Sequence, residues 1–347
     1  MGKYVLKRLG LAFLTAFLII SITFILVKLL PFERPIGGDQ QQIAYFDKQY
    51  SLGYVYRFDW AQDQSVYGEP LYKSPVTNGR AFYYYMVPAL RQYVHWLGNI
   101  VTKWDWGYSK SYQPNVSAAV IIGQRIGYSI RLNIISVIFS LPIGIALGIW
   151  AALKKNTKTD HIISTLIMVG ISVPSFLMIT FLLRILAYRL GWLPSSWPAD
   201  TATVATKIKG YVIPVLSLSF GSICVNCRSV RAELCEVLES DYLLLARTKG
   251  LTRKQAIMRH ALKNAMVPLF PGFLAEIIFV FGGAMILESL YSIPGIGRLY
   301  VVAIGYKDWD ILFVDLAIFI TFDLVVGIFL DLSYGLIDPR IRMGAKK

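Results

Sequence analysis

Six long apolar runs constrain the fold of this chain more than any other feature. A helix needs about 20 mainly apolar residues to cross the hydrocarbon core of a bilayer. The runs that meet this length are Leu9 to Leu30, Ile126 to Leu153, Ile162 to Leu186, Val212 to Val230, Met266 to Leu290 and Ile311 to Leu336. Because hydrophobic residues make up 55% of the 347 residues and charged residues only 16%, the chain is too apolar for an ordinary soluble protein. The sequence therefore predicts an all-α integral membrane protein with six transmembrane helices.

The first run is predicted to be an uncleaved anchor. Lys3, Lys7 and Arg8 precede it, its apolar length exceeds the core of a signal peptide, and no cleavage site of small residues follows it. Lys28, near its end, is expected to snorkel outward. Neighbouring helices can satisfy the carbonyls left unpaired by the prolines of the later runs, which are Pro142, Pro174, Pro214 and Pro271.

The placement of the basic residues explains the formal net charge of +14 without nucleic acid. If the N-terminus lies inside the cell, most Lys and Arg residues fall into cytoplasmic segments: Lys3 to Arg8, Lys154 to Lys158, Arg228 to Lys263 and Arg340 to Lys347. The short outer loops carry only Arg189, Lys207, Lys209, Arg298 and Lys307. Cytoplasmic loops are normally the ones enriched in Lys and Arg. The asymmetry therefore predicts that both termini are cytoplasmic.

The runs divide the chain into four parts. Residues 1–30 hold the N-terminal segment and the first transmembrane helix, 31–120 form a long extracellular loop or subdomain, 121–338 form a five-helix core, and 339–347 form a cytoplasmic tail. The extracellular part is rich in aromatic residues, among them Phe82, Tyr83, Tyr84, Tyr85, Tyr93, Trp96, Trp104, Trp106, Tyr108 and Tyr112. Two interpretations fit equally well: a subdomain that docks a partner or caps the pore, or aromatics that belong to a core and to an interfacial belt.

The cysteines and histidines do not predict a metal or catalytic site. Cys224, Cys227 and Cys235 lie in or just after one apolar run, and the C-x-x-C spacing of the first two also fits one helix face. All three are expected to be small packing residues. The histidines are scattered over different segments, at His95, His161 and His260.

Residues 240–268, named the basic hairpin here, carry the clearest local signals. Ser240 or Asp241 can cap a short helix from Tyr242 to Lys249. Gly250 fits the left-handed residue that commonly ends a helix. The sequence therefore predicts a first short helix that stops at this glycine.

A second helix of the basic hairpin is predicted to start at Thr252, because Gln255 three residues later completes a capping box, and to run toward Pro268. The hairpin carries leucines beside basic residues: Leu243, Leu244, Leu245 and Leu251 with Arg247, Arg253 and Lys254. Apolar anchors with a charged rim are typical of a protein-docking surface. A basic turn that touches anionic lipid fits about as well. Attachment to two spans argues against a DNA-binding helix-turn-helix.

Ionisable residues within spans are costly and mark functional candidates. Glu276, Asp315 and Asp323 are the acidic candidates, with Arg131 and Arg184 as possible positive counterparts. They either line a polar pathway or pair with one another or with a partner chain. Glu288 and Asp331, near span ends, are expected to be interfacial or capping residues.

Several strings resemble the permease subunits of ATP-binding-cassette importers, in particular the oligopeptide and dipeptide branch. In the basic hairpin they are Asp241-Tyr242, Ala246-Arg247, Lys249-Gly250-Leu251, Arg259-His260-Ala261, Asn264-Ala265 and Pro268. Elsewhere they are Asp105 to Ser109, Gly170 to Phe176, Leu190 to Pro194, Glu288, Pro294 to Arg298, Asp331, Tyr334 and Asp338 to Arg342. The resemblance covers residues 1–30 loosely and about 90–342 well.

This resemblance implies a transport subunit of a bacterial cell membrane that imports peptides and is not itself an enzyme. The basic hairpin becomes the coupling region, where an ATPase would contact Asp241, Tyr242, Ala246, Arg247, Lys249, Gly250, Leu251, Thr252 and Arg253. The implied partners are a second homologous permease, two cytosolic ATPase subunits that bind ATP and Mg²⁺, and an extracellular substrate-binding lipoprotein. The chain lacks a G-x-x-x-x-G-K-[ST] phosphate loop, so no cofactor is expected on it.

Three other functions were weighed against peptide import. Permeases of this architecture also import nickel chelates or other small solutes. A self-sufficient secondary transporter would need an internal repeat, and none is evident between spans one to three and four to six. A membrane enzyme would need clustered His, Cys or carboxylate residues.

Overall fold

The computed structural model describes residues 2–32, 34–35, 37–76, 81–278, 280 and 282–337, and these are mostly helical. Contacts divide the chain into two units, one of Met1–Gly127 with Arg298–Leu324 and one that contains Tyr128–Gly297. Four helices are long and apolar enough to cross a membrane: α1 (Gly2–Lys28), α5 (Ala118–Leu153), α8 (Val204–Leu238) and α15 (Trp309–Ile337). Two bent helix pairs raise the number of candidate spans to six. The four unbroken helices confirm the predicted first, second, fourth and sixth runs.

The third predicted span is broken rather than continuous. It consists of α6 (Lys158–Ile171), then α7 (Ser175–Leu182), which continues as the π-helix η1 (Leu183–Arg189), and the two parts are bent by 101°. Pro174 lies at the break with an extended backbone, as the residue before α7. A proline cannot donate the backbone hydrogen bond that would continue α6, whereas the start of a new helix needs no such donor. The bend therefore follows from the proline.

The fifth predicted span, Met266 to Leu290, is wrong as a single helix. The structure has α11 (Leu262–Met266), α12 (Phe270–Ile278) and α13 (Met285–Leu290), with a bend of 58° before α12. Past α12 the backbone of Gly283 approaches that of Gly297 so closely that a Cβ on Gly283 would lie 2.6 Å from the Gly297 nitrogen. The segment is therefore shaped by glycine contacts that an apolar run does not reveal.

Proline placement within the other helices agrees with the sequence. Pro142 and Pro214 lie inside α5 and α8, which continue past them. Pro271 is the second residue of α12, in the first turn, where the missing N–H would have no helical partner in any case.

Residues 39–103 fold around aromatic rings. Three strands form an antiparallel sheet of order β1-β3-β2: β1 (Val55–Phe58), β2 (Tyr72–Lys73) and β3 (Tyr83–Met86). Helix α2 (Asp39–Ser51) precedes β1 and lies beside the sheet. Along the chain, α3 (Gln64–Tyr67) comes between β1 and β2, and α4 (Ala89–Lys103) follows β3. Phe46 of α2 stacks on Tyr72 at 4.9 Å between ring centroids and also contacts Tyr84. Trp96 of α4 stacks on Phe24 of α1. The core interpretation is thus confirmed for these rings, whereas Trp104 is 71% exposed.

Lys28 does not extend away from the protein. Its ammonium lies over the rings of Phe24 and Tyr54, at 5.4 and 5.1 Å from their centroids. A cation over an aromatic face is stabilised by the ring quadrupole. The rings of Phe24 in α1 and of Tyr54 after α2 therefore supply partners for the Lys28 ammonium, and outward snorkelling of Lys28 stays a prediction.

A buried carboxylate fixes the loop that leads into α5. Asp308, between α14 (Ile296–Gly305) and α15, is fully buried. It accepts hydrogen bonds from the Ser109 hydroxyl at 2.7 Å and from the backbone N–H groups of Lys110, Ser111 and Tyr112 at 2.9 to 3.0 Å. These hydrogen bonds satisfy acceptor positions of the buried carboxylate. The string from Asp105 to Ser109 is therefore part of a loop tied to the start of α15.

Close helix contacts in the second unit depend on small residues. A Cβ on Gly148 of α5 would lie 2.7 Å from the carbonyl oxygen of Cys227 in α8, and one on Gly170 of α6 would lie 2.5 Å from the sulfur of Cys224. Both cysteines are buried among apolar side chains, which confirms the prediction that they are packing residues. Small residues let membrane helices approach closely, where packing rather than the hydrophobic effect drives association.

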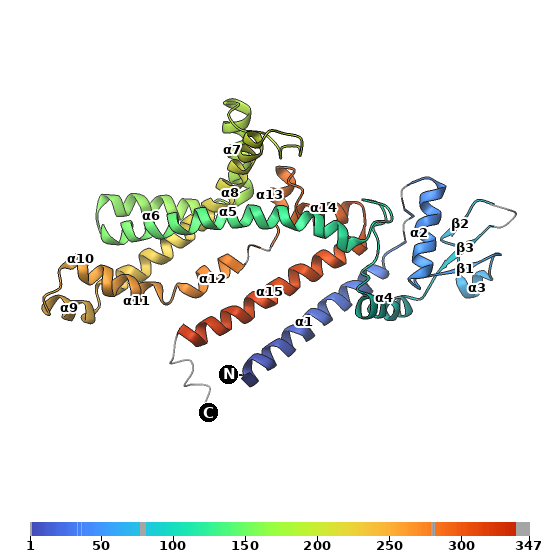
Figure 1. Ribbon diagram of the computed structural model, residues 1–347, viewed down its shortest axis with the longest axis horizontal. Helices are drawn as coiled ribbons and strands as arrows, with labels where there is room; N and C mark the ends of the chain where they lie inside the picture. The colour runs from blue at the N-terminus through green and yellow to red at the C-terminus, as the bar shows by residue number, and fades with distance from the viewer. Residues whose placement is uncertain are drawn as a thin grey trace. The chain divides into compact units, whose positions relative to one another are not determined.

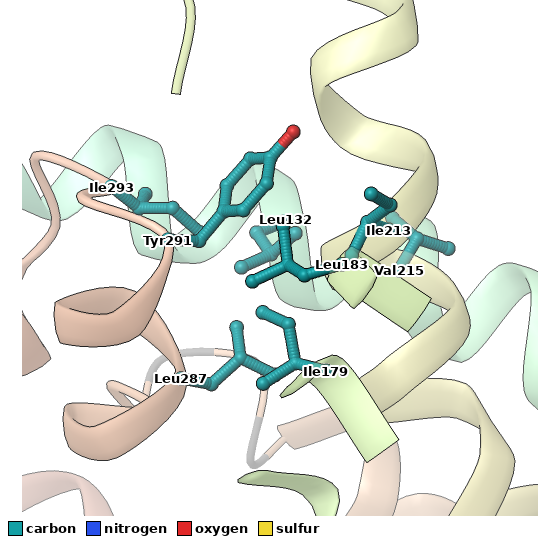
Figure 2. Packing of buried hydrophobic residues seen from close by; sticks show 8 residues of the cluster. All are labelled: Leu132, Ile179, Leu183, Ile213, Val215, Leu287, Tyr291 and Ile293. Carbon is teal, nitrogen blue, oxygen red and sulfur yellow. The ribbon is translucent and has the colours of Figure 1, made fainter. Parts of the chain in front are cut away.

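A second apolar cluster joins α5, α7, α8 and α13. Figure 2 shows its side chains facing one another across these helices: Leu132, Ile179, Leu183, Ile213, Val215, Leu287, Tyr291 and Ile293. The Tyr291 hydroxyl donates to the Pro194 carbonyl at 2.9 Å. The short helix α13 is thereby held against α7 and against the loop that follows η1.

A bidentate ion pair joins α6 to α8. Arg231 donates from Nε and Nη2 to the two oxygens of Asp160 at 2.6 and 2.8 Å, and Asp160 is 1% exposed. The Asn156 backbone N–H also donates to this carboxylate. A second pair, Lys155 with Glu239, is exposed, and the hydrogen bond that the Lys155 ammonium donates to the Glu239 carboxylate raises the pKa of Lys155.

We expect Asp160→Asn to destabilise the protein by about 2 kcal/mol, because it leaves a partly buried guanidinium without its carboxylate. The midpoint of thermal unfolding in detergent measures this. Lys155→Gln is the matched control, since an exposed pair contributes little, and its midpoint should not change. Equal unfolding midpoints for Asp160→Asn and the unsubstituted protein would contradict a stabilising role for the ion pair between Asp160 and Arg231.

Candidate functional site

The basic hairpin is a compact set of short helices at the end of α8. It contains α9 (Asp241–Thr248), α10 (Arg253–Ala256), the π-helix η2 (Ile257–Ala261) and α11, and Figure 1 shows α9 and α10 beside each other at this end. Helix α8 has 35 residues, which corresponds to roughly 52 Å at 1.5 Å per residue. A bilayer core is about 30 Å thick. Helix α8 is thus long enough to carry the hairpin beyond the hydrocarbon region.

Gly250 has the left-handed backbone that the sequence predicts. Its φ angle is +91°, and its N–H donates to the Arg247 carbonyl at 3.0 Å while the Leu251 N–H donates to the Ala246 carbonyl. A Cβ at this position would meet no atom within 4 Å. Any residue other than glycine would therefore be strained by its backbone angles alone, at about 1 kcal/mol or more.

The capping box at the start of α10 is also confirmed. The Thr252 hydroxyl accepts from the Gln255 N–H at 3.3 Å, and the Gln255 side chain accepts from the Thr252 N–H at 3.1 Å. Ser240 precedes α9 with an extended backbone, but its hydroxyl donates to the Val237 carbonyl instead of capping the helix. The turn between α9 and α10 is therefore fixed by Gly250 on one side and by Thr252 with Gln255 on the other.

The inner face of the basic hairpin is buried against α8. Leu243 of α9 and Ile257 of η2 pack with Leu234 and Cys235 of α8, and Leu251 packs against the same cluster. Leu243 is therefore a buried residue rather than an exposed apolar anchor, and the half-buried Leu251 also packs against α8. Such packing makes the hairpin and the end of α8 one stiff body.

The outer face of the hairpin is apolar at its centre and basic around it. Tyr242, Leu244 and Leu245 are exposed, the two leucines by 61% and 56%. The charged side chains near them are exposed as well: Asp241, Arg247, Lys249, Arg253 and Lys254. Ala246, the remaining predicted contact besides Gly250, Leu251 and Thr252, is half-buried. An apolar centre with a charged rim is the anatomy of a docking surface.

A cavity of about 340 Å³ opens between the end of α8, α9 and α10. Its walls carry two acidic and two basic residues in addition to apolar and small ones: Leu238, Glu239, Ser240, Asp241, Leu243, Leu244, Arg247, Arg253, Ala256 and Ile257. The cavity lies beside the exposed leucine Leu244, so the surface of the hairpin combines a projecting and a hollow part.

Glu276 lies in a polar cluster between three membrane helices. Its Oε1 accepts from the hydroxyls of Ser140 in α5, at 3.0 Å, and Ser222 in α8, and its Oε2 accepts from the Asn226 amide at 2.8 Å. These donors are neutral, and neither Arg131 nor Arg184 is among them. The cluster ties α12 to α5 and α8.

The structure places the remaining intramembrane candidates in different surroundings. Arg131 is exposed, with its guanidinium 5.0 Å from the centroid of the Tyr128 ring. Arg184 is exposed on η1, and Asp323 is exposed on α15. Asp315 of α15 is fully buried. Asp331 gives no side-chain information, since its side chain lies outside the described part of the chain.

Glu288 is a buried capping residue, one of the two alternatives left open by the sequence. It accepts from the Ser129 hydroxyl at 2.7 Å and from the Ala284 N–H that precedes α13, at 3.2 Å. A Cβ on Gly295 would lie 2.4 Å from both Glu288 Oε2 and Ser129 Oγ. The Pro294 to Arg298 string therefore contains a glycine that lets the backbone approach this carboxylate.

Sequence reasoning missed the structural roles of Asp160, Arg231 and Asp308. A signal for Asp160 was present, because Thr157 three residues earlier starts a helix with a capping pattern, and its hydroxyl accepts from the Asp160 N–H. No local pattern indicates Asp308, whose partners are about 200 residues away in the chain. Arg231 was read only as one of many cytoplasmic basic residues.

The sequence profile of a transporter family matches more than half of the chain. The family is described as the binding-protein-dependent transport system inner membrane component, and it matches residues 144–343. The chain belongs to this family. The matched part of this permease contains the basic hairpin, Glu276 with its partners Ser222 and Asn226, and both bent spans.

Curated relatives of the permease extend over its whole length. The dipeptide transport system permease protein DppB of Lactococcus lactis subsp. cremoris is 31% identical over 99% of this chain and 100% of its own. The oligopeptide transport system permease protein OppB of Haemophilus influenzae is 29% identical, with the same shares covered. A solved structure of inward facing conformations of the MetNI methionine ABC transporter aligns over 65% of this chain and 96% of that chain, with a TM-score of 0.47 and 15% identity.

We expect Thr252→Ala to loosen the start of α10. Loss of a capping hydroxyl costs about 1 kcal/mol, which makes local opening, and hence amide hydrogen exchange in residues 253–256, about fivefold faster. Exchange followed by mass spectrometry measures this rate. Thr248→Ala is the matched control, because the Thr248 hydroxyl bonds only to the Leu245 carbonyl within α9. Similar rates in both variants would contradict the capping role.

Proposed function

We propose that the chain is a permease subunit of an ATP-driven importer that moves peptides across the bacterial cell membrane, with ATP hydrolysed by separate subunits docked on the basic hairpin. The observation that carries the proposal is the hairpin itself. Its inner face is buried on α8, and its outer face is apolar with a basic rim. A surface of this kind, covalently joined to two membrane helices, can pass motion from a docked protein into the bilayer.

The names of the relatives support peptides as the cargo. DppB and OppB are a dipeptide and an oligopeptide permease, and each is aligned with this chain from end to end. The cargo is therefore proposed from whole-length similarity rather than from one motif. Selection among peptides would fall to an extracellular substrate-binding lipoprotein, and a second homologous permease would complete the pathway.

The hairpin lies between the two helices that it would move. Helix α8 leads into α9, and α11 leads past Pro268 into α12. If two ATPases close around nucleotide, a stiff hairpin moves as a rigid body and tilts α8 and α12 together. Packed helices have discrete arrangements, so such a tilt would switch the pathway between two states rather than bend it continuously. Nucleotide and Mg²⁺ would stay on the ATPases, since this chain has no phosphate loop.

The proposed contact with the ATPase is centred on Gly250. Its open left-handed turn would enter a cleft on the ATPase, together with Tyr242, Leu244 and Leu245. Acidic ATPase residues would complement the cationic rim. The predicted contact residues are those of the sequence: Asp241, Tyr242, Ala246, Arg247, Lys249, Gly250, Leu251, Thr252 and Arg253.

Gly250→Val is expected to reduce peptide uptake at least tenfold in a reconstituted importer, because the strained backbone displaces the docking turn. Copurification of the ATPase subunits should fall in parallel. The matched control is Gly68→Val. Gly68 also has a left-handed backbone, with φ +72° and open space around it, but it lies in the proposed extracellular part. Normal uptake by a correctly inserted Gly250→Val variant would overturn the docking role.

The proposed topology places both termini and the basic hairpin in the cytoplasm. All three native cysteines are buried, so single introduced cysteines report cleanly on the two sides. A membrane-impermeant maleimide added to intact cells should label Val76→Cys and should not label Thr248→Cys until the cells are opened. Labelling of Thr248→Cys in intact cells would reverse the topology.

A further inference from the structure

We propose that Glu276 binds the terminal ammonium group of a peptide during its passage, an inference that rests on the proposed peptide cargo. The site consists of one carboxylate and the three neutral side chains that hold it: Ser140, Ser222 and Asn226. Each comes from a helix of the same unit. The ligand class is a primary ammonium, and the free N-terminus of a peptide supplies it.

The first step of the argument is charge. Glu276 lies in α12, an apolar helix of a candidate span, where an ionised side chain is costly unless it has a function or a counter-ion. Within the part of the chain that the structure describes, its partners are two hydroxyls and one amide. These donors are neutral and bring no positive charge to the carboxyl group. The geometry of the cluster therefore leaves a place for a mobile cation beside Glu276.

The second step is hydrogen-bonding capacity. A carboxylate offers about four acceptor positions. Two donors occupy Oε1 and one occupies Oε2, so one position on Oε2 remains among the described residues. Ser140 and Asn226 are almost completely buried, but Glu276 itself is only half-buried. An ammonium group can donate to the remaining position without displacing a partner.

The third step is location. A half-buried carboxylate in a membrane helix does not face lipid, because its charge needs water or a polar partner. Helix α12 follows the basic hairpin directly, and Glu276 bonds to α8, which precedes it. A tilt of these helices would therefore change the distances within the cluster. Because three donors already share the charge, the bound ammonium would be held weakly and released when the cluster rearranges.

The test uses the purified complex of the two permeases and their ATPases, without the substrate-binding protein, and saturation-transfer NMR. The probes are tri-alanine and N-acetyl-tri-alanine, which differ in the ammonium group. Tri-alanine should give the stronger signal in the unsubstituted complex, and Glu276→Gln should weaken its binding about tenfold, to the level of the acetylated probe. Glu276→Asp, which keeps the charge, should retain the preference for tri-alanine.

Equal binding of the two probes, no binding of either, or an undiminished tri-alanine signal in Glu276→Gln would each overturn the inference. Uptake of tri-alanine by the complete importer tests the proposed function separately, since peptide transport with no ammonium preference would leave that function standing.

A second measurement does not depend on assembly of the Glu276→Gln variant. Glu276→Cys should react with the ammonium-bearing reagent aminoethyl methanethiosulfonate, because the proposal requires that an ammonium group can reach this position. No reaction with or without nucleotide would place this position away from the pathway and overturn the inference.

Discussion

The packing of the basic hairpin onto the end of α8 is the contact on which the proposed mechanism depends. A docking surface can transmit force only if it does not yield, and this one is held by the buried side chains of Leu243 and Ile257 against α8. Gly250 and the Thr252 to Gln255 capping box then fix the turn between α9 and α10. The outer leucines remain available because the inner ones complete the core. The buried face of the short helices thus fixes the hairpin on α8, and their exposed face is left for docking.

The polar groups within the membrane helices follow a related constraint. Water is absent from the bilayer core, so a charged or hydrogen-bonding group must find its partners inside the protein. Glu288 meets this requirement with Ser129 and a backbone N–H, and the buried Asp160, in the first turn of α6, is paired with Arg231. Glu276 has neutral partners alone among the described residues, which distinguishes it from Asp160. Asp160 has a cationic partner and a structural role, whereas the proposed transport role of Glu276 rests on its neutral partners.

Local signals in the sequence predicted the parts of the site that depend on neighbouring residues. Gly250, Thr252 and Gln255 act over a few residues, so their roles could be read from spacing and turn chemistry alone. The partners of Glu276 lie 50 to 136 residues away in the chain, and those of Asp308 about 200, so no local pattern indicates them. The hairpin leucines were misread for the same reason. Which side of a short helix is buried depends on the element that it packs against, and the local sequence does not identify that element.

The sequence by itself determined that this is a membrane protein of helical spans, because the length of an apolar run can be compared directly with the thickness of the bilayer. It also determined where the basic hairpin turns. Only the tertiary structure decided that two of the spans are bent and that Glu276 joins α12 to α5 and α8. A bend or a polar cluster depends on which residues of other helices a proline, a glycine or a polar side chain contacts. Those contacts are set by the folded arrangement and not by the order of residues.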